Sequence, residues 1–324
     1  MRLIKFIVLV LLLAVLLTYI FACFSESVAS FANENISIPI KGALSALTRA
    51  VPIPLFEILA VALPVAVIFL LWRHKIYLLT VIFSLLCALY IVNIAMPTIA
   101  DDAEGTSVEI AADECAAALI TVSDKLNQLS LASLQGSQDY AGHLRYIREE
   151  LGVELREVPK IKATAFPSLI DRFGTIGYFA FPTAEIIVSP SQPGFMLTFT
   201  EAHEMMHFCG VMREDAANMH AFKLLVSSGT PCNEFSAYFA AFTYIGALLA
   251  RLDAEKYFEI YARLNDSVKQ CLSERLVFVQ RGKGALNNAV SKANDTVITA
   301  RDERGAQSYS NTAVLLVRYI TERN

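Results

Sequence analysis

The segment from His203 to His207 has the residue types and the spacing of a zinc site. The two histidines are four residues apart, so on a helix both imidazoles lie on one face and can bind a single metal ion. Glu204 follows His203 by about 100° of helix rotation, which puts its carboxylate beside the metal position. There it can take a proton from water and pass it to the leaving amine of a peptide bond. The pattern predicts Zn²⁺ as cofactor and Glu204 as general base.

The residues that flank this motif favour a buried helix. They are mainly apolar from Met196 to Phe208, and neither proline nor glycine interrupts them before Gly210. Two imidazoles and a carboxylate on a buried helix need partners, and a metal ion supplies them. The alternative interpretation is a helix that carries two surface histidines and no metal.

A catalytic zinc ion needs a third protein ligand. We expect Glu214, which follows the turn at Gly210, to be that ligand, and Asn218 to hold a ligating histidine in place from one helical turn further on. Glu214 also fits a plain acid in the first turn of a helix, where the helix dipole stabilises it. The alternatives for the third ligand are His220, Asp215 and Glu234.

The elements that position this site form two parts. Of the 324 residues, 55% are hydrophobic and 18% charged, and the apolar excess lies in the first hundred. Three apolar runs, about 6–24, 55–72 and 76–96, are long enough to span a membrane. We therefore expect a membrane anchor over 1–100 and a peptidase-like domain over 101–324. A cleaved signal peptide is the alternative for the first run.

The basic residues predict how the anchor is oriented. Arg2 and Lys5 precede the first run, and Arg73 and Lys75 separate the second from the third. The positive-inside tendency makes that side cytoplasmic, so we expect a multi-pass cell-membrane protein with an extracytoplasmic domain. Within the runs Glu57 is nearly the only ionisable residue, which favours anchors over a transport pathway.

The rest of the composition excludes some classes and leaves other questions open. A net charge of −4 without a dense basic patch argues against a nucleic-acid partner. The six cysteines show no framework spacing, although those of the domain could pair in an oxidising compartment. The stretch 25–50 reads as a loop, with a helix on the membrane surface as the alternative.

The domain pattern predicts a mainly α fold (α+β) with a small sheet. Helical spacing covers 113–134 and 143–153, and 178–181 and 186–189 are strand candidates. We expect residues 178–189 to form the edge that aligns a substrate, with Tyr178 and Glu185 as substrate-binding residues. A plain packing strand is the alternative.

Several of these stretches resemble a bacterial membrane protein family known only as a domain of unknown function. The likeness covers about residues 170–320 and the anchor layout, and is carried by 177–185, 199–210, 214–218 and 305–309. That family has N-terminal spans and a predicted zinc peptidase domain, which implies a zincin-like, gluzincin-like fold here. The likeness also makes Tyr309 a candidate to donate a hydrogen bond to the tetrahedral oxyanion.

A second, local likeness concerns the third ligand. The residues from Arg213 to Asn218 resemble the Arg-Glu-x-x-Ala-Asp motif of membrane proteases that trim prenylated proteins. The glutamate of that motif is the third zinc ligand, which supports Glu214. The likeness does not extend far enough to imply their substrate.

These observations lead to one expected function and one alternative. We expect a membrane-anchored zinc metallopeptidase that acts on a peptide or protein substrate. The alternative is a catalytically inactive, zinc-stabilised binding or scaffold protein of the cell envelope. A structural zinc ion is usually held by four protein ligands, so a fourth ligand such as Cys209 would favour the alternative.

Overall fold

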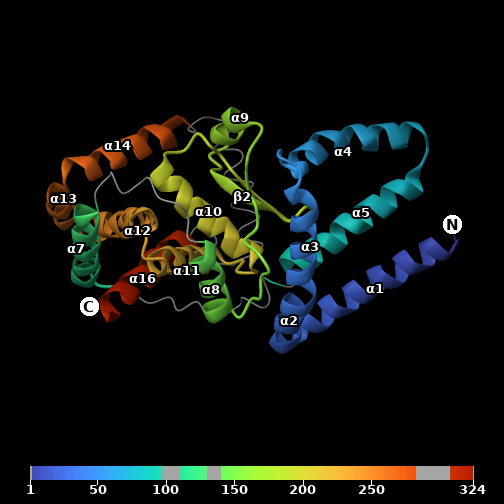
Figure 1. The fold of residues 1–324 in the computed structure, drawn as a ribbon, viewed down its shortest axis with the longest axis horizontal. Helices are drawn as coiled ribbons and strands as arrows, with labels where there is room; N and C mark the ends of the chain where they lie inside the picture. Colours follow the sequence, from blue (N-terminus) through green and yellow to red (C-terminus); the bar gives the residue numbers. More distant parts are fainter. Residues whose placement is uncertain (1, 96, 98–109, 130–139, 282–306, 324) are drawn as a thin grey trace.

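The computed structural model describes residues 2–95, 97, 110–129, 140–281 and 307–323. The chain is mainly helical with one small sheet, so the expected fold class is confirmed. The N-terminal apolar helices lie on one side of the molecule, and the sheet and the remaining helices lie on the other (Figure 1).

Three described helices are long and apolar enough to cross a membrane: Leu55–Trp72, Tyr77–Ala95 and Pro231–Leu252. The first is α4, and the second covers most of α5 (Ile76–Tyr90) and its π-helical continuation η2 (Ile91–Ala95). Both agree with expected spans. The first expected span lies within α1 (Arg2–Phe24), where Val10–Phe24 counts as a shorter apolar helix.

The segment between α1 and α4 is helical, so the expected loop is wrong. It consists of α2 (Glu26–Ala32), a π-helical turn η1 (Asn33–Ser37) and α3 (Ile38–Arg49). The buried residues of α3 recur three or four positions apart, which is the spacing of one helix face: Ile38, Lys41, Ser45 and Thr48. This face packs on later parts of the chain, and in Figure 1 α3 stands between the spans and those parts.

A helical core surrounds α12 (Pro231–Leu252), which packs against five other helices. Half of α12 is buried in these contacts, which explains an apolar composition that would also suit a span. The expected helix 113–134 is α7, which ends at Gln128, and the expected helix 143–153 is α8. The other core helices are α7 (Ala112–Gln128), α8 (Tyr140–Leu151), α10 (Gly194–Phe208), α11 (Glu214–Ser227), α13 (Ala254–Ala262), α14 (Asp266–Arg281) and α16 (Gln307–Glu322).

The sheet has three strands in the order β1-β3-β2, with β1 (Ile161–Ala163) parallel to β3 (Glu185–Val188) and β2 (Gly177–Ala180) antiparallel to it. The expected strands are therefore present, displaced by one residue. Of the two expected strands, β2 lies at an edge of the sheet. The other, β3, is central and fully buried, which corrects the expectation that 178–189 as a whole forms an edge. The strand β1 and the short helix α9 (Pro167–Arg172) were not expected. Helix α10 packs against both β2 and β3.

Candidate active site

The turn after α10 brings Glu214 back to the two histidines. The helix ends at Phe208, and Gly210 takes a φ of +98°, a left-handed conformation that glycine adopts without strain. Helix α11 then begins at Glu214, whose carboxylate oxygens lie 3.2 Å from His203 Nε2 and 3.7 Å from His207 Nε2.

These three side chains form one cluster that can hold a metal ion. One ligand atom from each lies within 4.8 Å of the others, and no other such group of three is found in the described part of the chain. Two imidazoles and a carboxylate are the protein ligands of many catalytic zinc sites, so the donor set fits zinc.

Hydrogen bonds fix how the imidazoles are presented. His207 Nδ1 lies 2.8 Å from the Val211 carbonyl, so it donates there and leaves Nε2 with a lone pair facing Glu214. His203 Nδ1 is buried and has no hydrogen-bond partner among the described residues, but the Asn218 amide is near enough to raise the pKa of this imidazole.

The Asn218 amide is itself held in place. Tyr244 donates to its oxygen at 3.2 Å, and its nitrogen donates to Thr312 Oγ1 at 3.3 Å. These partners come from α12 and α16, so the core helices support the residue that adjoins His203.

The electrostatics of the cluster favour a cation. Burial alone lowers the pKa of His203, but the hydrogen bond and charge of Glu214, with the charge of Glu204, raise it to about 9. A metal ion would replace the proton that this imidazole otherwise holds.

Glu204 is 6% exposed and lies directly beside the edge strand β2. A Cβ added to Gly177 would lie 2.6 Å from Thr200 Cγ2 and 3.1 Å from Glu204 Cγ. Strand and helix therefore approach each other closely only because residue 177 is glycine. The spacing of the zinc motif gave no indication of this contact.

The alternative ligands lie elsewhere. Asp215 is buried and pairs with Arg213 through oxygens 3.1 and 3.0 Å from the guanidinium nitrogens. His220 Nδ1 lies 3.0 Å from Tyr146 Oη, and burial together with the charge of Lys223 lowers the pKa of His220 to about 4. Glu234 is in the first turn of α12 and outside the cluster.

Cys209 is also outside the cluster, although it follows the last histidine by two residues. It is buried, and burial raises the pKa of its thiol to about 12 against the opposing charge of Lys41. Lys41 is itself fully buried, with Nζ 3.5 Å from the His207 carbonyl oxygen and 5.3 Å from the centre of the Phe179 ring. The segment that the sequence suggested to be a loop thus forms the back of the site.

Glu185 and Tyr178 make contacts with α4. Glu185 is buried, lies 2.5 Å from Lys162 Nζ, and accepts the backbone N–H groups of Leu55 and Phe56 at 2.9 and 2.8 Å. Burial would raise its pKa, but these hydrogen bonds lower it. Its carboxylate is therefore engaged with Lys162 and α4, and not turned toward the zinc motif as a substrate-binding residue would be. Tyr178 donates to Glu57 Oε1 at 2.8 Å.

Tyr309 lies in α16, but its side chain is outside the part of the structure that is described.

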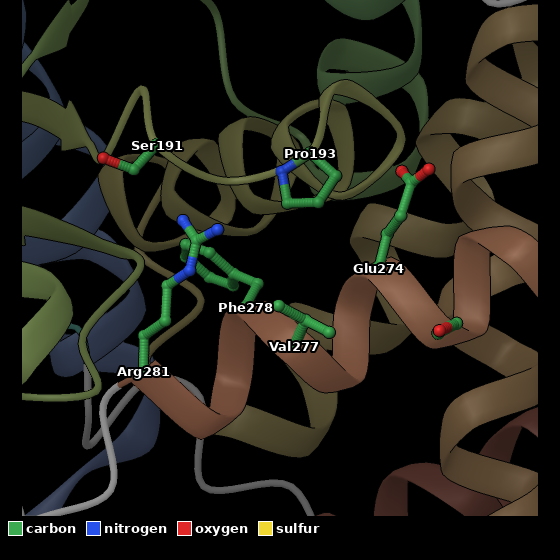
Figure 2. Close-up of a pocket in the computed structure, with 7 residues that line it drawn as sticks. Ser191, Pro193, Glu274, Val277, Phe278 and Arg281 are labelled. Carbon is green, nitrogen blue, oxygen red and sulfur yellow. The ribbon is translucent and has the colours of Figure 1, made fainter.

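A surface hollow of about 330 Å³ lies near the opposite end of α10 (Figure 2). Figure 2 shows Pro193, the residue before α10, facing α14 across it. Pro193 precedes His203 by ten residues, which is about 15 Å along a helix. The hollow is therefore separate from the His203 cluster. Its lining residues are Ser191, Pro193, Ser273, Glu274, Val277, Phe278 and Arg281.

One known protein family matches most of this chain. The family model described as "Protein of unknown function (DUF3810)" matches residues 32–317. The chain belongs to this family. The match begins in α2 and includes α3, so DUF3810 as a family takes in the helices that pack behind the site as well as α10 and α11. No curated protein and no solved structure matches the chain.

Proposed function

We propose that this DUF3810 protein is a membrane-anchored, zinc-dependent metallopeptidase. The observation that carries the proposal is the approach of Glu214 to both histidines, which gives three ligand atoms within 4.8 Å of one another. A helix that merely carried two surface histidines would not need a carboxylate from the next helix at this position.

Each residue of the cluster has a role in hydrolysis. His203, His207 and Glu214 would hold zinc, which when bound polarises a carbonyl and lowers the pKa of water toward about 7. Glu204 takes a proton from the attacking water and delivers it to the leaving nitrogen as the C–N bond breaks. Water thereby adds its oxygen to the acyl carbon and a proton to the amine. Tyr309 is proposed to donate a hydrogen bond to the oxyanion.

The edge strand β2 offers a way to hold an extended substrate. The backbone N–H of Ser189 donates to the Ile176 carbonyl at 2.8 Å. In an antiparallel pair only every second residue bonds to the neighbouring strand, so the backbone N–H and C=O groups of Gly177 and Phe179 point away from β3. An extended peptide can add to such an edge through main-chain hydrogen bonds. Because Gly177 contacts Glu204, a peptide bound there would run past the general base.

The scaffold alternative is the weaker candidate. Structural zinc is usually closed by four protein ligands, whereas the cluster contains three in the part of the chain that is described. The burial of Cys209 beside Lys41 gives no support to a fourth ligand. Three ligands leave a coordination position for water, which catalysis requires.

The membrane arrangement is proposed from the spans and their charges. Basic residues lie in the first turn of α1 and between α4 and α5, so the positive-inside tendency makes those ends cytoplasmic and the zinc cluster extracytoplasmic. Protease protection of the full chain in sealed vesicles would test this orientation.

Metal content and peptide cleavage together test the function. The full chain, purified in detergent, is expected to contain one zinc ion per chain and to cleave members of a peptide library. His203→Ala is expected to lose both properties, whereas Glu204→Gln is expected to keep zinc and lose cleavage. A Glu204→Gln protein that cleaves as fast as wild type would exclude this mechanism.

A further inference from the structure

Two of the proposed membrane spans, α4 and α5, contact the edge strand β2 beside Glu204. On α4, Glu57 accepts the hydrogen bond from Tyr178 at 2.8 Å. At the end of α5, Asn93 Nδ2 donates to the Phe181 carbonyl at 2.9 Å, and the rings of Tyr90 and Phe181 are 5.6 Å apart. These contacts lie near the two ends of β2, so each end of the strand is bonded to a different span.

The first turn of α4 is built into the sheet side of the protein. Glu185 accepts the N–H groups of Leu55 and Phe56, and Glu57 accepts the N–H of Ala165 at 2.8 Å. Glu57 is the only buried residue of α4, and from Ile58 onward the residues of the helix are exposed or partly exposed. The change from protein contact to lipid-facing surface therefore falls within the first turn.

The length of α4 fixes where the bilayer begins. Its 18 residues span about 27 Å at roughly 1.5 Å each, and the hydrocarbon core is about 30 Å thick. The helix has no residues to spare, so its first turn must lie at the surface of the bilayer. Since that turn bonds to Tyr178, β2 lies at the surface too.

The reacting position is then close to the lipid. Gly177 is next to Tyr178 and touches Glu204. Two links therefore connect the first turn of α4 to Glu204: the hydrogen bond from Tyr178 to Glu57 and the contact of Gly177 with Glu204.

Exposed apolar side chains near the same turn fit this location. Phe166 and Leu169 are 47% and 46% exposed, and Phe166 directly follows Ala165, which bonds to Glu57. Half-exposed apolar side chains beside the start of a span are suited to the interfacial zone of a bilayer.

We infer that the substrate of this site is a polypeptide already held in the membrane, cut within a few residues of the bilayer surface. The inference rests on the proposed peptidase function and adds the class of substrate. A polypeptide that leaves the bilayer beside α4 can bind to β2 as an extended strand within a few residues of the bilayer surface. A freely diffusing protein must instead bring its cleavable segment down to the lipid surface.

The depth of the site relative to the bilayer can be tested without an activity assay. The chain has one tryptophan, Trp72, so a Trp72→Phe background allows a reporter at Phe166→Trp in vesicles with a nitroxide on the lipid headgroup. The control is Phe258→Trp on α13, which is 65% exposed and lies across the molecule from the spans (Figure 1). We expect the nitroxide to quench the reporter at 166 at least threefold more strongly than the one at 258. Equal quenching at the two positions would overturn the inference.

The substrate class is tested with anchored peptides. The probe is a mixed-sequence cleavable segment joined to a transmembrane helix by spacers of 4, 12 or 30 residues, reconstituted in vesicles with the full chain. We expect cleavage at the four-residue spacing to be at least tenfold faster than at 30, with no cleavage by Glu204→Gln. All three anchored probes have the same surface concentration, so the comparison reports reach and not recruitment.

The outcomes separate this inference from the proposed function. If cleavage needs Glu204 but is equally fast at every spacing and with the detached segment, the peptidase function stands and the membrane-held substrate is excluded. If no probe is cleaved and the chain holds no zinc, the peptidase function fails, and this inference fails with it.

Discussion

Replacing Gly177 by alanine tests the contact between β2 and α10. The φ of Gly177 lies outside the left-handed range, so space alone opposes the substitution. The new methyl would be 2.6 Å from Thr200 Cγ2, whereas carbon atoms pack at about 3.5–4.0 Å. Strand and helix must therefore separate by about 1 Å. Overpacking of this kind costs about 1–3 kcal/mol of unfolding free energy.

The same displacement affects the general base. The methyl would also lie 3.1 Å from Glu204 Cγ and 3.2 Å from its Oε1, so the carboxylate must move. A shift of about 1 Å in a catalytic group can reduce kcat by about 100-fold. Zinc content is expected to stay unchanged, because the three atoms nearest to the new methyl belong to Thr200 and Glu204, and neither residue is a proposed ligand. The assays are chemical unfolding, metal analysis and kcat for a cleaved library peptide.

Two matched variants complete this test. Gly194→Ala, at the start of α10, meets nothing within 4 Å and is expected to be neutral or slightly stabilising. Thr200→Ser removes the methyl that Gly177→Ala would strike but keeps the hydroxyl that donates to Gln192 at 2.8 Å, so in the double variant it should restore most of the stability. If Gly177→Ala alone had wild-type stability and kcat, the close approach of β2 to Glu204 would be refuted.

Three further predictions concern the supports of the site. Glu185→Gln removes the counter-charge of buried Lys162 and should cost about 3–5 kcal/mol in chemical unfolding, with part of the loss regained in Glu185→Leu/Lys162→Met; a cost below about 1 kcal/mol would contradict the buried pair. The pKa of His220, lowered from 6.5 to about 4, means that the unfolded chain binds more protons between these values. The resulting stability is present above pH 6.5 and is lost as the pH falls toward 4, so His220→Gln should flatten the pH dependence of unfolding there; an unchanged slope would refute this. Tyr309→Phe should reduce kcat by about 10²–10³ with KM little changed if its hydroxyl serves the oxyanion, and an unchanged kcat removes it from the mechanism.

The helices and strands that have a simple apolar pattern were predictable from the sequence. The long apolar runs gave α4 and α5, and the two short apolar runs 178–181 and 186–189 gave β2 and β3 within one residue. For the segment that contains α3, a loop was preferred to a surface helix. The burial of α3 was not predicted, because its buried face carries Lys41, Ser45 and Thr48, and polar residues are expected to face solvent unless their partners are known. The strand β1 has three residues, too few for a pattern to emerge.

The same distinction holds for the candidate site. The spacing of His203 and His207 is local, and the turn at Gly210 brings Glu214 back within a few residues, so sequence reasoning could assemble this cluster. The partners of Glu185 and Tyr178 on α4 lie more than a hundred residues away in the sequence. No local spacing indicates such contacts, so the substrate-binding role of Glu185 was predicted without them.

The central claim is that His203, His207 and Glu214 hold a zinc ion at which Glu204 acts as base. The most direct measurement is zinc per chain, with peptide cleavage measured on the same samples, for wild type, Glu214→Ala and Glu204→Gln. We predict one zinc ion and cleavage in wild type, loss of both in Glu214→Ala, and one zinc ion without cleavage in Glu204→Gln. Wild-type protein that binds no zinc, or Glu204→Gln that cleaves at the wild-type rate, would contradict the claim.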